Sequence, residues 1–129
     1  MNAGPMSAKI LVVDDDPEIR DGIAGLLSAA GHRVETAGDA AAAARLIAAD
    51  RFDLLITDIV MPNKDGLELI RGLPADRPKV LAISGGSAKL PAAYTLGASG
   101  ALGADATLFK PFTAGDLTAA VNALLQAKG

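Results

Sequence analysis

Three aspartates, a serine and a lysine lie where short apolar runs of the sequence end. Asp14 and Asp15 follow the first run, Asp58 follows the third, Ser84 ends the fourth and Lys110 follows the fifth. If these runs are parallel strands of one sheet, their carboxyl ends meet at the same edge, where ligands usually bind. We therefore expect the five side chains to converge.

The three carboxylates of this group require a cation. Without one they would repel one another and raise each other's pKa. Oxygen donors without histidine or cysteine favour Mg²⁺, which commonly keeps several waters and shares its coordination with a phosphate. The lysine and the hydroxyl add an anion clamp, so the group has the parts for phosphoryl transfer. Asp58 is the expected nucleophile because of its central position.

Five strands alternating with five helices are expected to position these residues. Continuous apolar runs of this length are typical of strands buried on both faces of a parallel sheet. With helices and short loops between them, they predict an α/β fold with a doubly wound five-stranded parallel sheet. The predicted strands cover residues 10–13, 33–37, 52–57, 79–84 and 106–109.

Polar caps and helix stops define the five predicted helices. Asp16 beside Pro17 predicts the start of the first, and Thr113 with Asp116 predicts a capping box at the start of the last. The helix over 91–102 is the weakest, because each of its two glycines costs about 1 kcal/mol relative to alanine. The predicted helices cover 17–30, 39–49, 65–70, 91–102 and 113–127. The buried face of the first is expected to contain Ile19, Ile23, Leu26, Leu27 and Ala30, and that of the last Leu117, Ala120, Val121, Leu124 and Leu125.

Composition excludes several classes of protein. The 129 residues contain no cysteine, which excludes a disulfide scaffold and a thiolate metal site. A net charge of −3 provides no basic field for nucleic acid or anionic lipid, so we expect no direct binding to either. No apolar run is long enough to span a membrane, and the N-terminus lacks the pattern of a signal peptide. We therefore expect a cytoplasmic protein.

At these residues the sequence resembles the receiver domain of two-component response regulators. The resemblance extends from Lys9 to Leu125 and rests on the motifs ILVVDDDPEIR, LLITDIVMPNKDGLELI, AISGG and LFKPF, in that order. It implies a flavodoxin-like fold of the receiver type. It also implies that Asp58 accepts a phosphoryl group from a histidine kinase or a phosphotransfer protein.

The resemblance assigns a role to each residue of the group. Asp15 would bind Mg²⁺ directly, Asp14 mainly through water, and Asp58 and the backbone carbonyl of Val60 would complete the protein ligands. Lys110 would pair with one phosphoryl oxygen and Ser84 would hydrogen-bond another. The family pattern also implies a cis peptide bond between Lys110 and Pro111, an isomer that X-Pro bonds tolerate.

The sequence departs from the family in the segment between Ser84 and Lys110. Many receivers carry an aromatic residue three positions before the lysine, where this chain has Thr107. Alternation along a strand places Phe109 on the same face, as a partial substitute. The segment is also long and rich in glycine, so we hypothesise that phosphorylation orders it. Neither Val60 nor Gly86 can position an attacking water through a side chain, which predicts slow hydrolysis of the phosphorylated form.

Other polar residues near the group have simpler structural interpretations. Asp16 is interpreted as a helix cap, and Asp65 and Gly66 as turn and helix-start residues. His32 follows the helix stop at Gly31, on the opposite edge of the sheet. We expect it at the surface and outside the site.

These observations predict a stand-alone receiver: one domain over residues 1–129, with a core of about 8–127 and no output domain. It would catalyse only its own phosphorylation and dephosphorylation. Its output would come from contact with a downstream target protein or from a phosphorelay, and a phosphorylation-dependent homodimer is compatible with the sequence. One alternative is a binding-only pseudo-receiver. The other is a small aspartate-based phosphatase, which needs a second aspartate two residues after the nucleophile, where this chain has Val60.

Overall fold

Five parallel strands form a single sheet. The computed structural model describes residues 7–59, 66–74, 77–84 and 104–126. Within them the strand order is β2-β1-β3-β4-β5, so the chain reverses direction across the sheet between β1 and β3. This order confirms the predicted doubly wound α/β fold. The strands are β1 (Lys9–Val13), β2 (Arg33–Ala37), β3 (Leu54–Asp58), β4 (Lys79–Ser84) and β5 (Ala106–Phe109).

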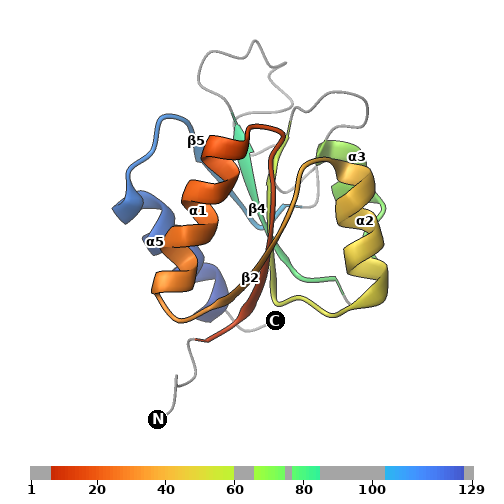
Figure 1. The fold of residues 1–129 in the computed structure, drawn as a ribbon, viewed down its shortest axis with the longest axis horizontal. Coiled ribbons are helices and arrows are strands. Elements are labelled where there is room, and N and C mark those ends of the chain that lie inside the picture. The colour runs from red at the N-terminus through yellow and green to blue at the C-terminus, as the bar shows by residue number, and fades with distance from the viewer. Residues whose placement is uncertain (1–6, 60–65, 75–76, 85–103, 127–129) are drawn as a thin grey trace.

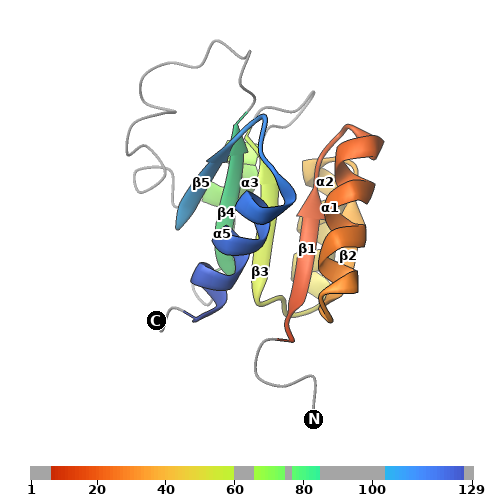
Figure 2. The same cartoon turned by 90° about the vertical axis from the view of Figure 1, so that its left-hand side faces the viewer.

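Helices cover both faces of this sheet. Figures 1 and 2 show α1 and α5 on one face and α2 and α3 on the other. The part of the chain that the structure describes contains four helices: α1 (Pro17–Ala29), α2 (Ala40–Ala49), α3 (Gly66–Arg71) and α5 (Ala114–Gln126). The helix predicted over 91–102 lies outside the described residues.

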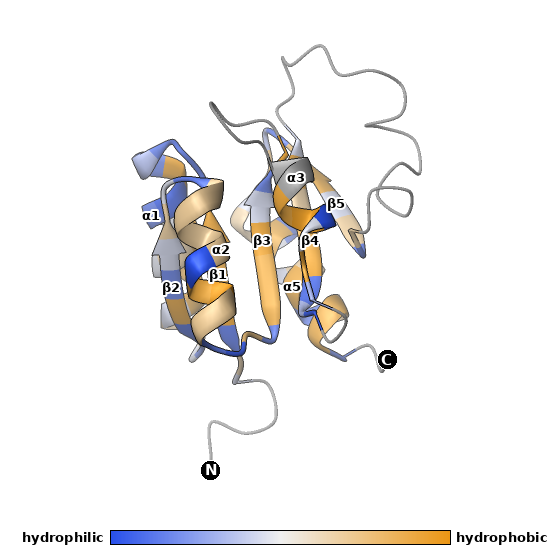
Figure 3. Cartoon of the chain, turned by 90° about the vertical axis from the view of Figure 1, so that its right-hand side faces the viewer, coloured by the Kyte–Doolittle hydropathy of each residue, from blue (hydrophilic) through white to orange (hydrophobic). Residues whose placement is uncertain are grey.

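The apolar runs become the central strands because helices cover both of their faces. Every residue of β3 is buried, and Figure 3 shows this strand as hydrophobic along most of its length. Successive side chains point to opposite faces, so each strand contributes to two cores. In β1, Ile10 and Val12 pack with the α1 and α5 layer, whereas Leu11 and Val13 pack with α2 and α3.

The predicted caps hold the helices in place. The Asp16 carboxylate accepts a hydrogen bond from Glu18 N (3.0 Å) at the start of α1. At the start of α5, Thr113 and Asp116 form the reciprocal capping box, with bonds of 2.9 and 3.0 Å. Gly31 ends the α1 segment with a φ of 100°, a conformation that favours glycine.

Several element boundaries differ from the prediction by one or two residues, and one buried face differs as well. β3 begins at Leu54 instead of residue 52, because the side chain of Asp53 accepts a hydrogen bond from Lys9 N (2.9 Å) before the strand ladder begins. It also extends one residue further, so that Asp58 is its last residue. α1 ends at Ala29, and Ala30 is an exposed C-cap outside the buried face.

The prediction that His32 lies at the surface is wrong. His32 is 8% exposed, and its Nδ1 accepts a hydrogen bond from Ala8 N (3.0 Å). This bond joins the start of β1 to the turn before β2, so the imidazole is enclosed by the sheet edge. His32 still lies at the opposite end of the strands from Asp58, as expected.

Candidate functional site

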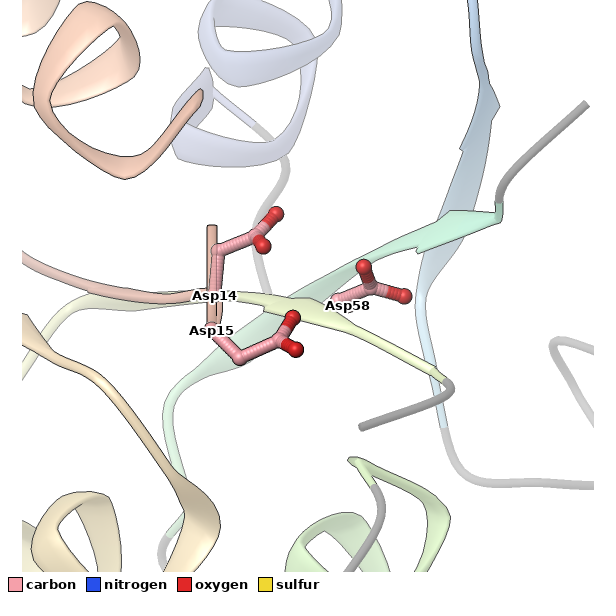
Figure 4. Close-up of side chains that lie close together, drawn as sticks. All are labelled: Asp14, Asp15 and Asp58. Carbon is pink, nitrogen blue, oxygen red and sulfur yellow. The ribbon is translucent and has the colours of Figure 1, made fainter. Parts of the chain in front are cut away.

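The ends of β1 and β3 bring three aspartates together. These strands are neighbours at the centre of the sheet, and Val13 pairs with Thr57 in their register. Asp14 and Asp15 follow β1 directly, and Asp58 ends β3. One carboxylate oxygen from each of the three lies within 4.8 Å of the others (Figure 4). The structure therefore assembles the acidic cluster that the sequence predicts.

Asp14 is the most deeply buried member of this cluster. Its residue surface is 1% exposed, and its Oδ1 accepts a hydrogen bond from Asp16 N (2.9 Å). Its buried Oδ2 has no hydrogen-bond partner among the described residues. Burial raises the pKa of the Asp14 carboxyl above its ordinary value, and the charges of Asp58 and Asp15 raise it further, against the opposing effects of the Asp16 bond and Lys110.

Lys110 supplies the positive charge that faces this cluster. Its Nζ lies 3.3 Å from Asp58 Oδ2 and 3.7 Å from Asp14 Oδ2. The lysine directly follows β5, and its backbone amide donates a hydrogen bond to Ser84 O (2.9 Å), which fixes it against the end of β4. The bond to Pro111 is cis, as the family resemblance implies.

Ser84 and Phe109 occupy the neighbouring strand ends. Ser84 is the last residue of β4, is buried, and pairs in register with Phe109. Ala106 and Leu108 pack with the α1 and α5 core, so alternation directs Phe109 to the opposite face, together with Thr107. Phe109 is 49% exposed and is the exposed large hydrophobic residue of the described chain. The segment predicted to become ordered on phosphorylation falls mostly within residues 85–103, outside the described part.

The donor atoms of the acidic cluster fit Mg²⁺. All three are carboxylate oxygens, the class of ligand that this ion prefers. The Oδ2 of Asp14 adds a second sign. No described residue donates a hydrogen bond to it, and Lys110 Nζ faces it only from 3.7 Å, which leaves the buried carboxylate incompletely compensated. The carbonyl of Val60, the fourth predicted ligand, lies outside the described residues.

One residue at this site was missed in the sequence. Arg20, on the first turns of α1, donates a hydrogen bond from Nη1 to the backbone carbonyl of Asp14 (3.2 Å). Side chains on a helix point back toward its N-terminus, so an arginine one turn after the Asp16 cap could have been expected to reach the preceding loop.

Comparison with known proteins identifies the family. Residues 10–122 match the family model described as the response regulator receiver domain. The chain belongs to this family. The receiver is 40% identical over 123 residues to response regulator MprA of Mycobacterium ulcerans, an alignment that covers 94% of this chain and 51% of that protein. The chain thus spans about half the length of the curated relatives that it matches.

Solved structures share the receiver fold. NtrX from Brucella abortus superposes with a TM-score of 0.82 and 35% identity, over 93% of this chain and 27% of that one. The chemotaxis response regulator CheY4 of Vibrio cholerae gives a TM-score of 0.80 and 29% identity, over 92% of this chain and 98% of that one. The second match extends over almost the whole of both chains, so the receiver fold accounts for nearly all of this one.

Membership of the family establishes the general role of the chain. Receivers are signalling modules of two-component systems, act with histidine kinases or phosphotransfer proteins, and typically use Mg²⁺ at an acidic site. The acidic cluster of this receiver is compatible with that ion. In the described part of the chain, no helix has the length and apolar character needed to cross a membrane.

Proposed function

We propose that this receiver takes a phosphoryl group onto Asp58 from a phosphohistidine of a histidine kinase or phosphotransfer protein. The observation that carries the proposal is the position of Asp58, which shares a cluster with two further aspartates while Lys110 Nζ lies 3.3 Å from its Oδ2. An Asp58 carboxylate oxygen attacks phosphorus, the phosphorus–nitrogen bond breaks, and the electron pair of that bond stays on the histidine nitrogen. The product is an acyl phosphate on Asp58.

Asp14, Asp15 and Asp58 are the residues that would hold Mg²⁺. When bound, the ion neutralises charge that develops between the carboxylates and the transferred phosphoryl oxygens. The exposed Asp15 is the more accessible ligand of the pair, and the buried Asp14 would act mainly through a water molecule. A role for the Val60 carbonyl as a further ligand remains a prediction.

Lys110 and Ser84 would bind the phosphoryl group after transfer. The ammonium that now pairs with Asp58 and Asp14 would pair with a phosphoryl oxygen, and the Ser84 hydroxyl would donate to another. Lys110 is held for this role by its backbone bond to Ser84. The two residues therefore form one unit at the ends of β4 and β5.

Output of the signal would pass through contact with another protein or through a phosphorelay. The net charge of −3 disfavours direct contact with nucleic acid. The half-exposed Phe109 is adjacent to Lys110, so a partner protein that contacts this ring would sense a change at the site. A homodimer of the phosphorylated form is part of this proposal. The mass of the native protein, with and without phosphorylation, tests it.

Intact mass spectrometry tests phosphoryl acceptance. After incubation with acetyl phosphate and Mg²⁺, the wild type should gain about 80 Da per phosphoryl group. Asp58→Asn should gain nothing, whereas Glu18→Gln, which removes an exposed carboxylate on α1, should behave as the wild type. Chelation of Mg²⁺ should abolish the gain. A wild type that stays unmodified with acetyl phosphate and with a phosphorylated donor protein would support the pseudo-receiver alternative.

A further inference from the structure

Arg20 reaches back from α1 to the loop that carries the acidic pair. Its Nη1 donates to the backbone carbonyl of Asp14 (3.2 Å), and its Nε lies 3.7 Å from the exposed carboxylate of Asp21. The side chain is 22% exposed, so most of the guanidinium stem is packed against the protein. Its hydrogen bond to the loop is thus made to the main chain.

Gly38 leaves the space that the guanidinium occupies. A Cβ atom at this position would lie 3.1 Å from Arg20 Nη1, closer than such atoms normally approach. Its backbone does not adopt the left-handed conformation that would itself require glycine. The glycine is therefore explained by the close approach of Arg20 to the loop after β2.

Together these contacts fix the Asp14 main chain from both sides. Asp14 N donates to Ala37 O (3.2 Å) at the end of β2, and Asp14 O accepts from Arg20. The Asp14 carbonyl belongs to the planar peptide that joins Asp14 to Asp15. An anchor on this carbonyl therefore sets the orientation of both residues of the pair at once.

We propose that Arg20 is a positioning residue for the metal-binding pair, with Gly38 as the residue that admits it. The proposal rests on the proposed function of Asp14 and Asp15 as Mg²⁺ ligands. The Asp14 carboxylate is held by Asp16 N at its Oδ1, whereas its Oδ2 has no hydrogen bond from a described residue, so an anchor on the main chain contributes to its direction. Partners that orient metal ligands in this indirect way commonly change metal affinity when they are removed.

Arginine suits this position better than lysine. A guanidinium can direct one N–H at the Asp14 carbonyl while its Nε faces Asp21, whereas an ammonium is a single point charge. Arg20→Lys should therefore retain the charge near the loop and recover part of the function that Arg20→Ala loses.

Mg²⁺ titration of the full chain, followed by ¹H–¹⁵N NMR spectra, tests the proposal. We expect Arg20→Ala to raise the Kd for Mg²⁺ roughly tenfold, with a smaller increase in Arg20→Lys. The matched control is Arg45→Ala, which removes an exposed arginine from α2 and should leave the Kd unchanged. An Arg20→Ala protein with the wild-type Kd would overturn the proposal.

Gly38→Ala separates positioning from stability. The added methyl should push the guanidinium a few tenths of an ångström from its place beside the Asp14 carbonyl and weaken Mg²⁺ binding. The metal-free melting temperature should stay unchanged or rise, because alanine restricts the unfolded chain. A merely structural Arg20 would instead give a lower melting temperature and an unchanged Kd. Unaltered Mg²⁺ affinity in Gly38→Ala would contradict the proposal even if Arg20→Ala failed to fold. Absence of Mg²⁺ binding in the wild type would overturn the proposed function together with the role of Arg20.

Discussion

Asp14 shows how the site works against the stability of the fold. Its carboxylate is buried beside two others, with one oxygen unsatisfied among the described residues, and Lys110 compensates only in part from 3.7 Å. A group selected for stability alone would not be ionised in this position. The proposed role of this carboxylate as a Mg²⁺ ligand would account for its position.

Asp14→Asn should therefore stabilise the metal-free protein. The substitution removes one of three clustered negative charges and keeps an oxygen that can accept the bond from Asp16 N. We expect a gain of about 1–3 kcal/mol in the free energy of unfolding, the usual cost of an unsatisfied buried group. Urea unfolding measures it. Asp21→Asn, an equal charge change on the surface of α1, should shift the free energy by less than about 0.5 kcal/mol.

Removal of the Lys110 ammonium should slow phosphoryl acceptance without abolishing the fold. Lys110→Ala deletes the positive charge 3.3 Å from Asp58, where charge develops during transfer. Loss of one such electrostatic group typically lowers a rate roughly a hundredfold or more. The rate of mass gain with acetyl phosphate measures the effect, and Lys79→Ala at the opposite end of the sheet serves as the control. Equal rates in Lys110→Ala and wild type would rule out this role.

The structural role of a residue was predictable where its partner lies close in sequence. It was not predictable where the partner lies far away in sequence. Asp16 and the Thr113–Asp116 pair follow from helix-capping patterns within four residues. The burial of His32 depends on the amide of Ala8, which lies 24 residues away, so its neighbours in sequence gave a misleading indication. Arg20 is an intermediate case. Its position on α1 indicated that the side chain points toward the preceding loop, but not that it binds the carbonyl of Asp14.

At the scale of elements, the capping box of α5 carries a measurable share of stability. Thr113 Oγ1 accepts a hydrogen bond from Asp116 N at 2.9 Å, and this helix buries Leu117 and Val121 against the sheet. Thr113→Ala should lower the free energy of unfolding by about 1 kcal/mol. Thr118→Ala is a matched control within the same helix, because its hydroxyl bonds back to Ala114 O and contributes little. Equal losses in the two variants would contradict the assignment.

Element types were predicted better than element ends. The buried central strands follow from continuous apolar runs, because a parallel sheet covered on both faces leaves no polar side. The predicted start of β3 was two residues too early because Phe52 is as apolar as a strand residue. In the structure Phe52 precedes the strand and is buried in the core formed with α2 and α3. A side-chain bond from Asp53 to Lys9 N sets the boundary, and no periodicity reveals such a bond.

At the scale of the whole molecule, the strand order is what creates the site. The chain reverses across the sheet between β1 and β3, so the loops after these strands diverge and leave room at their carboxyl ends. The order of motifs in the sequence predicted this edge as the place of chemistry, and the structure assembles Asp14, Asp15, Asp58 and Lys110 there. The Val60 carbonyl and the segment over 85–103 stay predictions.

The stability of the metal-free molecule should depend on pH in a direction set by Asp14. Its pKa is raised in the folded state by burial, so the folded protein retains this proton at pH values where the unfolded chain, with an ordinary pKa of about 4, has lost it. The free energy of unfolding should then fall as the pH rises from about 4 through the folded pKa. Urea midpoints measured across this range should show the fall in the wild type and a weaker one in Asp14→Asn.

The surface pair of Lys9 and Asp50 should change the free energy of unfolding at low pH and at high pH. The hydrogen bond from Lys9 lowers the pKa of Asp50, and the same bond raises the pKa of Lys9. The contribution of Asp50 is therefore lost as the pH falls through its lowered pKa, and that of Lys9 as the pH rises through its raised pKa. The pKa of Asp50 is lowered and that of Asp14 is raised, so the two carboxyls change the free energy of unfolding with pH in opposite directions.

The measurement that tests the central claim most directly is the chemical location of the phosphoryl group. After reaction with acetyl phosphate and Mg²⁺, borohydride converts an acyl phosphate to an alcohol, so a phosphorylated aspartate becomes homoserine and is found by peptide sequencing in a mass spectrometer. The tryptic peptide over 52–64 contains both Asp58 and Asp53, which makes Asp53 an internal control. We predict homoserine at position 58 and unmodified aspartate at position 53. Homoserine at any other aspartate, or an unmodified Asp58 in a protein that has gained phosphoryl mass, would contradict the account.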